Sequence, residues 1–594
     1  MTSCYTESTL FETDTSFIIQ PCEAAKGEAC SVITIDKKDP LHPVCSEHAS
    51  GTVVPPSPST RRGPPLTIYG VLGLLPFSAT DVRLIVITSR ECVGNLPQPL
   101  WKVTGTKVIK LSSTTSPNSA KWSALIDRLL SVKSLFYAND WDCTHPTQRR
   151  VEKATENNAK KSMWERAEDK FFWNRYISQA LIDAGADRWV VPTFMGYAAL
   201  KTVGVKGEEV TLGLISRRSR FRAGMRLFMR GIDEEGHVAN EVETEQLLMI
   251  RGKPLASYVE TRGSIPALWS QLPNVAYKPP MVVTGEREAN INLAKTHFEG
   301  LTEMYGGLVS CVSLIDHKGK ELVLAEEYAA ISEALNNLNS EKIKIKYTSF
   351  DFHKECKGGK TEKLSILLDQ IRDDIANTHY YSEEGESRQV GIFRVNCIDN
   401  LDRTNVVQTL IGRVVLEAQL RKYNILTSES DSISSDANLL AAFKTIWADN
   451  ADAISTQYTG TGAQKNDITR TGKRTFKGML DDGVNAMTRY YKNNFADGDM
   501  QDAYNLFLGV FNPLKDGEGK AAPAGGLNLG ACLMALVVVG VILMGVGVKK
   551  VLSGSDVLCG IIICVICFLV FKFMKSAVKN HGRQLVNNPK LVKN

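Results

Sequence analysis

The chain lacks several features that would place it in other protein classes. Its N-terminus has neither a basic segment nor a long apolar run, so we expect no signal peptide. The protein is then expected to face the cytosol, where its 13 cysteines stay reduced and form no disulfide framework. A net charge of +5 over 594 residues is too small to indicate nucleic acid as a partner. The sequence also contains no evident internal repeat or long low-complexity block.

Recognisable metal and nucleotide sites are missing as well. Three cysteines of the apolar stretch 557–571 have no matching histidines, so packing explains them better than metal binding. Gly472 and Lys473 resemble the end of a nucleotide-binding loop, but Arg474 follows and no glycine stands five residues before Gly472. We therefore expect neither a metal nor a cofactor.

The most informative stretch is 390–405, which reads V-G-I-F-R-V-N-C-I-D-N-L-D-R-T-N. An apolar, strand-like run leads into Cys397, and Arg403 follows six residues later. Downstream, apolar residues recur on one face of a helix, at Val406, Val407, Leu410, Ile411, Val414, Val415 and Ala418. The loop is therefore expected at a helix N-terminus, where backbone N–H groups and the helix dipole favour a bound phosphate and a thiolate. This order predicts a cysteine-dependent phosphatase.

The residues of this loop have expected roles in such a reaction. Cys397 attacks phosphorus in line and forms a phosphocysteine, which water then hydrolyses. Arg403 binds two phosphoryl oxygens through its planar guanidinium. Thr404 either donates a hydrogen bond to the sulfur as the intermediate breaks down or caps the following helix. Backbone N–H groups of the loop are expected to bind the phosphate, at Ile398, Asn400 and Leu401.

The leaving alkoxide needs a proton, and two pairs of residues are candidates to supply it. Asp399 and Asp402 lie inside the loop, where a nearby phosphate dianion raises a carboxyl pKa. The equally weighted alternative is that they only accept N–H bonds of the loop or brace its arginine. Asp351 and His353 form the second pair, and a supporting role is favoured for them because the flanking phenylalanines fit a half-buried strand end.

A second Cys-x5-Arg sequence occurs at Cys143 and Arg149. A proline in its loop removes one N–H group, and no comparable apolar strand precedes it. A polar segment rather than a buried helix follows. We expect Cys143 to be structural.

The wider sequence R-V-N-C-I-D-N-L-D-R-T-N resembles the signature of the Sac-domain phosphoinositide phosphatases. Further segments similar to this family follow in order: F-F-W-N at 171–174, S-R-R-S-R-F-R-A-G at 216–224, R-G-I-D-E-E-G-H at 230–237, N-E-V-E-T-E-Q at 240–246, T-R-G-S-I-P at 261–266, F-D-F-H-K-E-C at 350–356, W-A-D-N-A-D-A at 447–453 and T-R-T-G-K-R-T at 469–475. The resemblance covers roughly 66–511 and again 588–592, and it implies Cys397 as nucleophile and Arg403 as phosphate binder. Asn400 stands where close relatives often carry a second cysteine, so no redox partner of Cys397 is expected there.

Within this family the chain most resembles the membrane-anchored member that converts phosphatidylinositol 4-phosphate into phosphatidylinositol at the endoplasmic reticulum and Golgi. The resemblance implies an enzyme for phosphatidylinositol monophosphates that favours the 4-phosphate, with the 3-phosphate as a second candidate. A phosphoinositide-binding or tethering protein with weak catalysis is the alternative. A phosphoprotein phosphatase is disfavoured because the similar segments are those of lipid phosphatases. Protein partners are not indicated.

Two basic stretches have alternative explanations. Six arginines between Arg217 and Arg230 alternate with apolar residues, which is typical of a solvated face of strands, and contact with an inositol phosphate is the alternative. The second stretch contains Lys473 and Arg474, which the family resemblance places near the active site. We expect these two residues to attract the substrate and to dock on an anionic membrane surface.

The C-terminal region predicts a membrane anchor. No charged residue occurs from Ala521 to Val548, and the run 527–548 is long enough to span a bilayer core. A second, shorter run is expected to return over 557–574. Basic residues after this hairpin outnumber those in its turn, so the tail 575–594 and the catalytic domain are expected on the cytosolic side.

The remaining chain predicts an α/β or α+β fold. The polar residues 1–15 are expected to form a mobile tail, and alternating runs at 84–88 and 101–111 indicate a β-rich N-terminal Sac domain over 16–186. Strands and helices then alternate over 187–512, which predicts a Cys-x5-Arg phosphatase-like catalytic domain packed on the first domain. The family resemblance implies the same division. A linker over 513–526 leads to the two-helix transmembrane hairpin.

Overall fold

The computed structural model describes residues 3–517, with gaps at 23–28, 50–52, 97, 156–160, 339–342, 358–360, 386, 429, 465 and 472–474, and then residues 583 and 586–592. The expected membrane segments 527–548 and 557–574 lie outside the described residues, as do Lys473, Arg474 and most of the expected linker. Among the helices that are described, none combines the length and apolar character needed to cross a bilayer. The transmembrane hairpin therefore stays a prediction.

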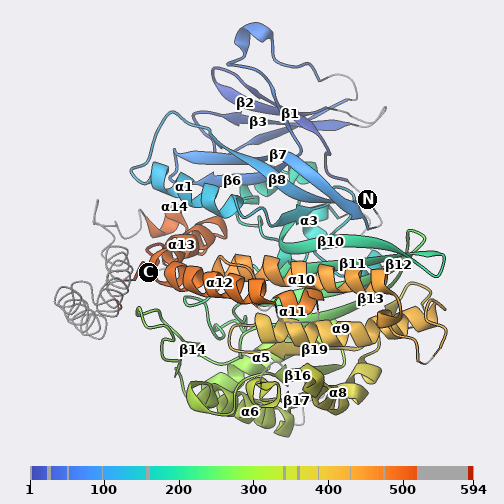
Figure 1. Ribbon diagram of the computed structural model, residues 1–594. Helices are drawn as coiled ribbons and strands as arrows, with labels where there is room; N and C mark the ends of the chain where they lie inside the picture. The colour runs from blue at the N-terminus through green and yellow to red at the C-terminus, as the bar shows by residue number, and fades with distance from the viewer. Residues whose placement is uncertain are drawn as a thin grey trace, which may run out of the picture.

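Strands β1 to β5 form a small antiparallel sheet at one end of the molecule (Figure 1). Its order is β4 (Val44–His48), β3 (Cys30–Asp36), β2 (Ser16–Pro21), β1 (Ser8–Glu12) and β5 (Leu66–Ile68). The prediction of a mobile tail over residues 1–15 is wrong for β1, which pairs with two strands. Leu10 of β1 packs with Phe17 and Ile19 of β2 in one apolar cluster, and these contacts fix a segment that looks polar in sequence.

A second, twelve-stranded sheet runs through most of the described chain (Figure 1). Its order is β17 (Ile345–Ser349), β16 (Leu308–Ser313), β19 (Gly391–Asn396), β13 (Lys253–Arg262), β12 (Val242–Ile250), β11 (Glu208–Arg218), β10 (Thr193–Val205), β9 (Leu135–Tyr137), β8 (Pro99–Lys110), β7 (Val82–Asn95) and β6 (Gly70–Pro76), with β18 (Tyr381–Ser382) paired to β13. The strands predicted at 84–88 and 101–111 are confirmed as parts of β7 and β8. Because β9 pairs with β10, the sheet joins strands from both sides of the boundary expected at residue 186.

The part of this sheet that leads into Cys397 is parallel. β19 runs parallel to β16 on one side and to β13 on the other. Its side chains alternate between two helical layers. Ile392 packs in the cluster of α5 (Arg287–Tyr305) and α6 (Leu322–Asn337), whereas Phe393 and Val395 pack with α8 (Leu364–Thr378) and α9 (Asp402–Lys422). A strand buried on both faces needs an apolar run, and this explains the sequence that precedes Cys397.

The other elements cover the antiparallel strands or connect the layers. The long helix α10 (Ala437–Thr459) packs with α9 over β11 and β12. The remaining elements are α1 (Ser119–Leu130), α2 (Thr147–Thr155), α3 (Met163–Arg166), α4 (Gln179–Asp183), α7 (Phe352–Glu355), α11 (Asn466–Thr471), α12 (Phe476–Phe495), α13 (Asp497–Phe507), α14 (Pro513–Asp516), and the hairpin of β14 (Trp269–Ser270) and β15 (Val282–Val283). Together these elements give a mixed α/β fold with a large mixed sheet.

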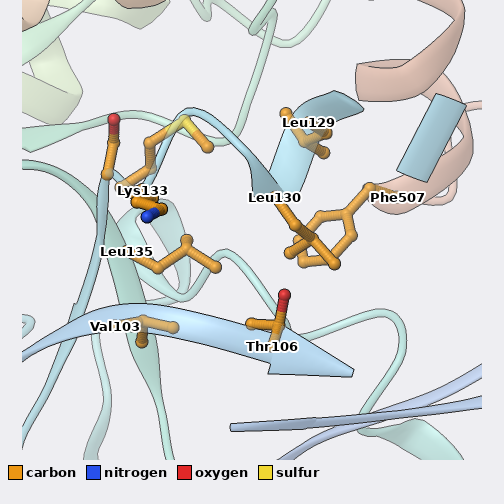
Figure 2. A pocket seen from close by; sticks show the side chains of 9 residues that line it. Val103, Thr106, Leu129, Leu130, Lys133, Leu135 and Phe507 are labelled. Carbon is orange, nitrogen blue, oxygen red and sulfur yellow. The ribbon is translucent and has the colours of Figure 1, made fainter. Parts of the chain in front are cut away.

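Helix α13 joins the N-terminal and C-terminal parts of the chain. Figure 2 shows Val103 of β8, Leu130 of α1 and Phe507 of α13 around a small hollow. Its volume is about 10 Å³, close to the least that one water molecule requires. The hollow is therefore a packing gap between these elements rather than a substrate site.

The end of the chain returns to α13. The Asp502 carboxylate accepts hydrogen bonds from the N–H groups of Lys590 and Leu591 at 2.8 and 2.7 Å, and Asn505 donates to the Leu591 carbonyl oxygen at 2.7 Å. Leu591 is only 1% exposed. The described part of the expected cytosolic tail is thus docked on the folded unit.

Candidate active site

Cys397 lies where the carboxyl end of β19 meets the N-terminus of α9. The predicted order of strand, loop and helix is confirmed, and α9 covers the whole apolar face predicted downstream. In a parallel sheet with helices on both faces, this edge is where ligands bind. A cleft of about 710 Å³ opens here, and its lining includes Arg226, Cys397, Asp399, Asp402, Arg403 and Arg489.

The loop from Cys397 to α9 rests on a buried arginine. Arg262 at the end of β13 donates through Nη1 to the carbonyl oxygen of Asn400 at 3.3 Å and also to Asn405 Oδ1. Asn400 has a φ of +53°, a left-handed conformation that asparagine tolerates better than most residues. In the described part of the chain, the N–H groups of Ile398, Asn400 and Leu401 donate to no protein acceptor. Their unpaired donors lie at the start of α9, where an anion is favoured.

Thr404 contacts the sulfur directly. Its Oγ1 donates a hydrogen bond to Cys397 Sγ at 3.4 Å, and both side chains are buried. Leu401 occupies the N-cap of α9 and Thr404 lies inside the first turn of the helix. The N-cap alternative for Thr404 is therefore wrong, and its position fits a donor to sulfur.

Asp399 is held by two arginines of the stretch 217–230. Its Oδ1 accepts from Arg230 Nη2 at 2.6 Å and its Oδ2 accepts from Arg226 Nη1 at 3.1 Å. Burial by itself raises the pKa of Asp399, but the two guanidinium groups outweigh it and hold the pKa well below its ordinary value. Arg230 also donates to the Ile398 carbonyl oxygen at 3.0 Å. Asp399 therefore stays ionised and holds the loop in place through these arginines. An ionised carboxylate is disfavoured as the proton donor.

Asp402 begins α9 and borders the same cleft. Its Oδ1 accepts from the N–H group of Gln464 at 2.9 Å, and its Oδ2 lies 3.9 Å from Arg489 Nη1. The side chain is 27% exposed, so it remains accessible from the cleft. Asp402 is thus a carboxylate that lines the cleft at the N-terminus of α9.

Arg403 pairs with carboxylates from the segment after β16. Nη1 donates to Asp316 Oδ1 at 3.2 Å and to Glu321 Oε2 at 3.1 Å, and Nη2 donates to Glu321 Oε1 at 3.2 Å. Nη1 also donates to the Leu314 carbonyl oxygen at 2.8 Å. Burial lowers the pKa of Arg403, but Cys397 and the two carboxylates outweigh it and raise the pKa above its ordinary value. Arg403 is a permanent cation whose guanidinium is shared with two acids.

Asp351 and His353 lie in the turn of α7 rather than at a strand end, so that part of the prediction is wrong. Asp351 caps α7 by accepting from the N–H group of Lys354 at 3.0 Å. Burial raises the pKa of Asp351, but the backbone hydrogen bonds from Lys354 and His317 outweigh burial and lower the pKa below its ordinary value. His353 Nδ1 lies 2.7 Å from Asp316 Oδ1, and Asp316 in turn binds Arg403. Both residues are placed to support others.

The arginine stretch is not a solvated face of strands, and that prediction is wrong. Arg217 pairs with Glu243 at 3.0 Å and with Glu245 at 2.9 Å, and all three side chains are 1% exposed. These acids lie on β12, the neighbour of β11, so the charges are buried together in the sheet. Arg226 and Arg230 reach the loop of Cys397 instead. The sequence shows the arginines and the acids, but it does not show that Glu243 and Glu245 pair with Arg217.

Cys143 has a structural environment. It is buried, and burial raises the pKa of its thiol to about 12. Its carbonyl oxygen accepts a hydrogen bond from Arg217 Nε at 2.8 Å. A thiol with this pKa forms no nucleophilic thiolate at neutral pH.

Four residues of the site were not predicted from the sequence: Arg262, Asp316, Glu321 and Arg489. Asp316 had a usable signal, because it follows an apolar strand and the carboxyl ends of parallel strands meet at one edge. Arg262 lies in a segment that resembles the family, at the end of β13. Burial lowers the pKa of Arg262 to about 10, although Glu260 and Cys397 act in the opposite direction. Glu321 and Arg489 carry no local pattern that marks them.

One cluster in the described residues has the atom types of a metal site. Ligand atoms of Asp233, Glu235 and His237 lie within 4.8 Å of one another. The N–H group of His237 donates to Asp233 Oδ1 at 2.7 Å, and the His237 ring stacks on Phe221. These contacts already explain the turn, so the cluster indicates no role in the chemistry.

Comparison with known proteins identifies the family. The model of the SacI homology domain matches residues 69–357. The phosphatidylinositol-3-phosphatase SAC1 of Drosophila melanogaster is 37% identical over 528 residues, which cover 88% of this chain and 85% of that protein. The phosphoinositide phosphatase SAC7 of Arabidopsis thaliana is 37% identical over 84% of this chain and 83% of its own length. The phosphatidylinositol-3-phosphatase SAC1 of Saccharomyces cerevisiae is 33% identical over 76% and 74%. With identity of this level over most of both chains, the protein belongs to the SAC1-type family of phosphoinositide phosphatases.

Proposed function

We propose that the protein is a membrane-anchored phosphatase that converts phosphatidylinositol monophosphates into phosphatidylinositol, with the 4-phosphate favoured and the 3-phosphate as a second substrate. One observation carries the proposal. Cys397, Arg403 and the unpaired N–H groups of the loop meet at the N-terminus of α9, beside an open cleft. The names of the relatives, phosphatidylinositol-3-phosphatase and phosphoinositide phosphatase, support the substrate class.

The proposed reaction has two steps. Cys397 attacks the phosphorus in line, the sulfur–phosphorus bond forms, and the inositol oxygen leaves and takes a proton. Water then attacks the phosphocysteine and releases inorganic phosphate. The N–H groups of Ile398, Asn400 and Leu401 bind the equatorial oxygens, and Thr404 donates to the sulfur as it leaves.

The pairing of Arg403 adds a condition to phosphate binding. A phosphate dianion competes with Glu321 and Asp316 for the same guanidinium, because a planar fork binds phosphate and carboxylate alike. Productive binding therefore exchanges at least one of these carboxylates for a phosphoryl oxygen.

We assign the proton donor to Asp402. Asp399 is tied to Arg226 and Arg230, which keep it ionised. Asp402 borders the cleft, is partly exposed and accepts a backbone hydrogen bond from Gln464. A bound phosphate dianion raises the pKa of such a carboxyl group and lets it hold a proton.

The proposed anchor is the hairpin 527–548 and 557–574, in membranes of the endoplasmic reticulum and Golgi, with Lys473 and Arg474 on the anionic surface. Its support is the uncharged stretch from Ala521 to Val548. In addition, α14 precedes this region and the docked segment 586–592 follows it on the same folded unit. Since the segments before and after the proposed hairpin both belong to the same folded unit, the chain between them should cross the membrane an even number of times.

The test is phosphate release by the full chain from each phosphatidylinositol monophosphate in EDTA. We expect release that is fastest from the 4-phosphate, abolished by Cys397→Ser and unchanged by the matched control Cys143→Ser. No release by the native protein, with lipid binding retained, would overturn the enzyme and favour a binding or tethering protein. Release from a phosphotyrosine peptide but from no lipid would contradict the substrate class.

A further inference from the structure

Helix α12 presents an apolar face to the outside of the molecule. Six large apolar side chains lie along one side of it, at helical spacing, and are between 42% and 73% exposed: Phe476, Met479, Leu480, Val484, Met487 and Tyr491. A surface helix normally buries such a stripe against the core. An exposed apolar stripe of this length marks an interaction surface.

The opposite face of α12 is polar and points inward. Arg489, Asn493 and Asn494 are buried, and all three line the cleft of Cys397. Arg489 donates through Nε to Thr461 at 3.0 Å and through Nη2 to Ser455 at 3.2 Å. Three polar side chains of α12 therefore face the catalytic cleft, whereas the six large apolar side chains named above are exposed.

A second apolar element lies beside α12 at the cleft. Tyr277, between β14 and β15, is 69% exposed and stacks on Tyr490 with ring centroids 6.3 Å apart. Tyr490 donates to the Val275 carbonyl oxygen at 2.6 Å, and the Val275 N–H group donates to Asn494 at 3.1 Å. These bonds tie the segment between β14 and β15 to α12, so the apolar surface continues from the helix to this rim of the cleft.

The charges around this surface fit an anionic partner. Lys278, Lys318 and Lys320 are exposed and line the cleft, and Lys477 is exposed on α12. Asp481 is an exposed acid on the same helix, so charge attraction is modest there and apolar contact supplies most of the binding.

We infer that the apolar face of α12, together with Tyr277, is a lipid-inserting surface that seats the cleft of Cys397 on the bilayer that holds its substrate. The inference rests on the proposed lipid substrate. It adds that access to membrane-bound substrate depends on α12, whereas the chemistry does not. A soluble phosphate ester reaches the same cleft without insertion of the helix.

The test compares two substrates with full-length protein in phosphatidylcholine proteoliposomes. One substrate is long-chain phosphatidylinositol 4-phosphate in the bilayer, and the other is its dibutanoyl analogue in solution. We expect the double variant Phe476→Ser/Met487→Ser to lose roughly tenfold or more on the bilayer substrate and less than about twofold on the soluble one. The matched control is Val44→Ser/Val54→Ser, because Val44 on β4 and Val54 in the loop that follows β4 are both exposed. The small sheet lies at the end of the molecule opposite β16 and β19 (Figure 1), so this variant should leave both rates unchanged.

A second readout does not depend on activity. Met487→Trp adds a tryptophan to the proposed surface, and Val54→Trp adds one at the control position. The difference in fluorescence from the parent protein should be quenched by lipids brominated at shallow acyl positions for Met487→Trp only. This readout separates the proposed phosphatase activity from the proposed lipid-inserting surface. If the native protein were inactive on both substrates and Met487→Trp still showed quenching, the proposed activity would be wrong and the proposed surface would stand.

Other results would overturn the inference. Equal losses on both substrates, or no loss on either, would show that α12 does not seat the cleft on lipid. Conversion of a dimer into a monomer by the double variant would assign the face to a second copy of the chain. A fall in melting temperature of more than a few degrees would show that the chain itself covers the face.

Discussion

Replacing Asp399 by asparagine separates the two explanations of this loop carboxylate. In the structure it neutralises Arg226 and Arg230, with oxygen–nitrogen distances of 3.1 and 2.6 Å. Arg230 is 2% exposed. The Asp399→Asn variant keeps the shape of the side chain but leaves a buried guanidinium without its counter-charge.

The magnitude follows from this burial. Removing one partner of a buried ion pair costs about 3–5 kcal/mol. Asp399 is 29% exposed, and Arg230 keeps its hydrogen bonds to Ile398 and Gln271, so we expect a cost at or just below the lower end of this range, about 2–3 kcal/mol. At about 2 °C per kcal/mol, the apparent melting temperature should fall by about 4–6 °C. The displaced loop should also reduce kcat by roughly 100-fold, because misplacement by about 1 Å has such effects.

The pH dependence has a definite sign. The pKa of Asp399 in the folded protein lies below its ordinary value of 3.8. Its contribution to stability is therefore complete above that value and is lost as the pH falls through the folded pKa. The difference in stability between the native protein and Asp399→Asn should be constant from about pH 5 to pH 8 and shrink below about pH 4.

Thermal unfolding and pH–rate profiles on a soluble substrate measure these effects. The control is Asp14→Asn, which breaks an ion pair with Arg62 whose side chains are 69% and 64% exposed, and it should change neither quantity. The reasoning is refuted if Asp399→Asn melts like the native protein and loses only the alkaline limb of the kcat profile, because Asp399 would then be the proton donor.

Three further outcomes are expected. Glu321→Gln weakens the hold on Arg403, so KM for a soluble substrate should fall about fivefold, the equivalent of about 1 kcal/mol for a partly exposed pair; a higher KM in steady-state kinetics would instead mean that Glu321 positions Arg403. Cys143→Ala should keep phosphate release within about twofold, since burial raises the pKa of this thiol to about 12, and loss of turnover without loss of folding would contradict its structural role. Leu591→Asp should lower the free energy of unfolding by about 3 kcal/mol in denaturant titrations, because Leu591 is buried. Val592→Asp, at a side chain that is 44% exposed, should change it by less than about 0.5 kcal/mol. Equal effects of the two variants would show that the segment 586–592 is not docked on α13.

The sequence was sufficient where one continuous segment carries the information. The apolar run before Cys397, the six-residue spacing to Arg403 and the helical face after it all belong to neighbouring residues. A strand buried on both faces, a phosphate loop and an amphipathic helix each impose a local pattern, so β19 and α9 could be predicted with the loop between them. The family resemblance rests on similar local segments.

Local patterns misled the prediction where burial depends on distant partners. Residues 8–12 look polar, yet they pair with β2 and β5 and form a strand. Arg217 looks like a residue of a solvated strand, yet Glu243 and Glu245 on the adjacent strand neutralise it inside the sheet. In both cases the stabilising contact is made by residues whose proximity the sequence does not encode locally.

The tertiary structure alone decided how the site is charged and where it opens. The sequence supplied Asp399 and Arg403 as neighbours in one loop, but the fold gives them separate partners: Arg226 and Arg230 for the acid, Asp316 and Glu321 for the arginine. The same holds for α12, whose amphipathic pattern is present in the sequence, while only its packing shows that the polar face is the one turned inward. The physical reason is that periodicity defines the faces of an element, whereas the surrounding chain determines which face is buried.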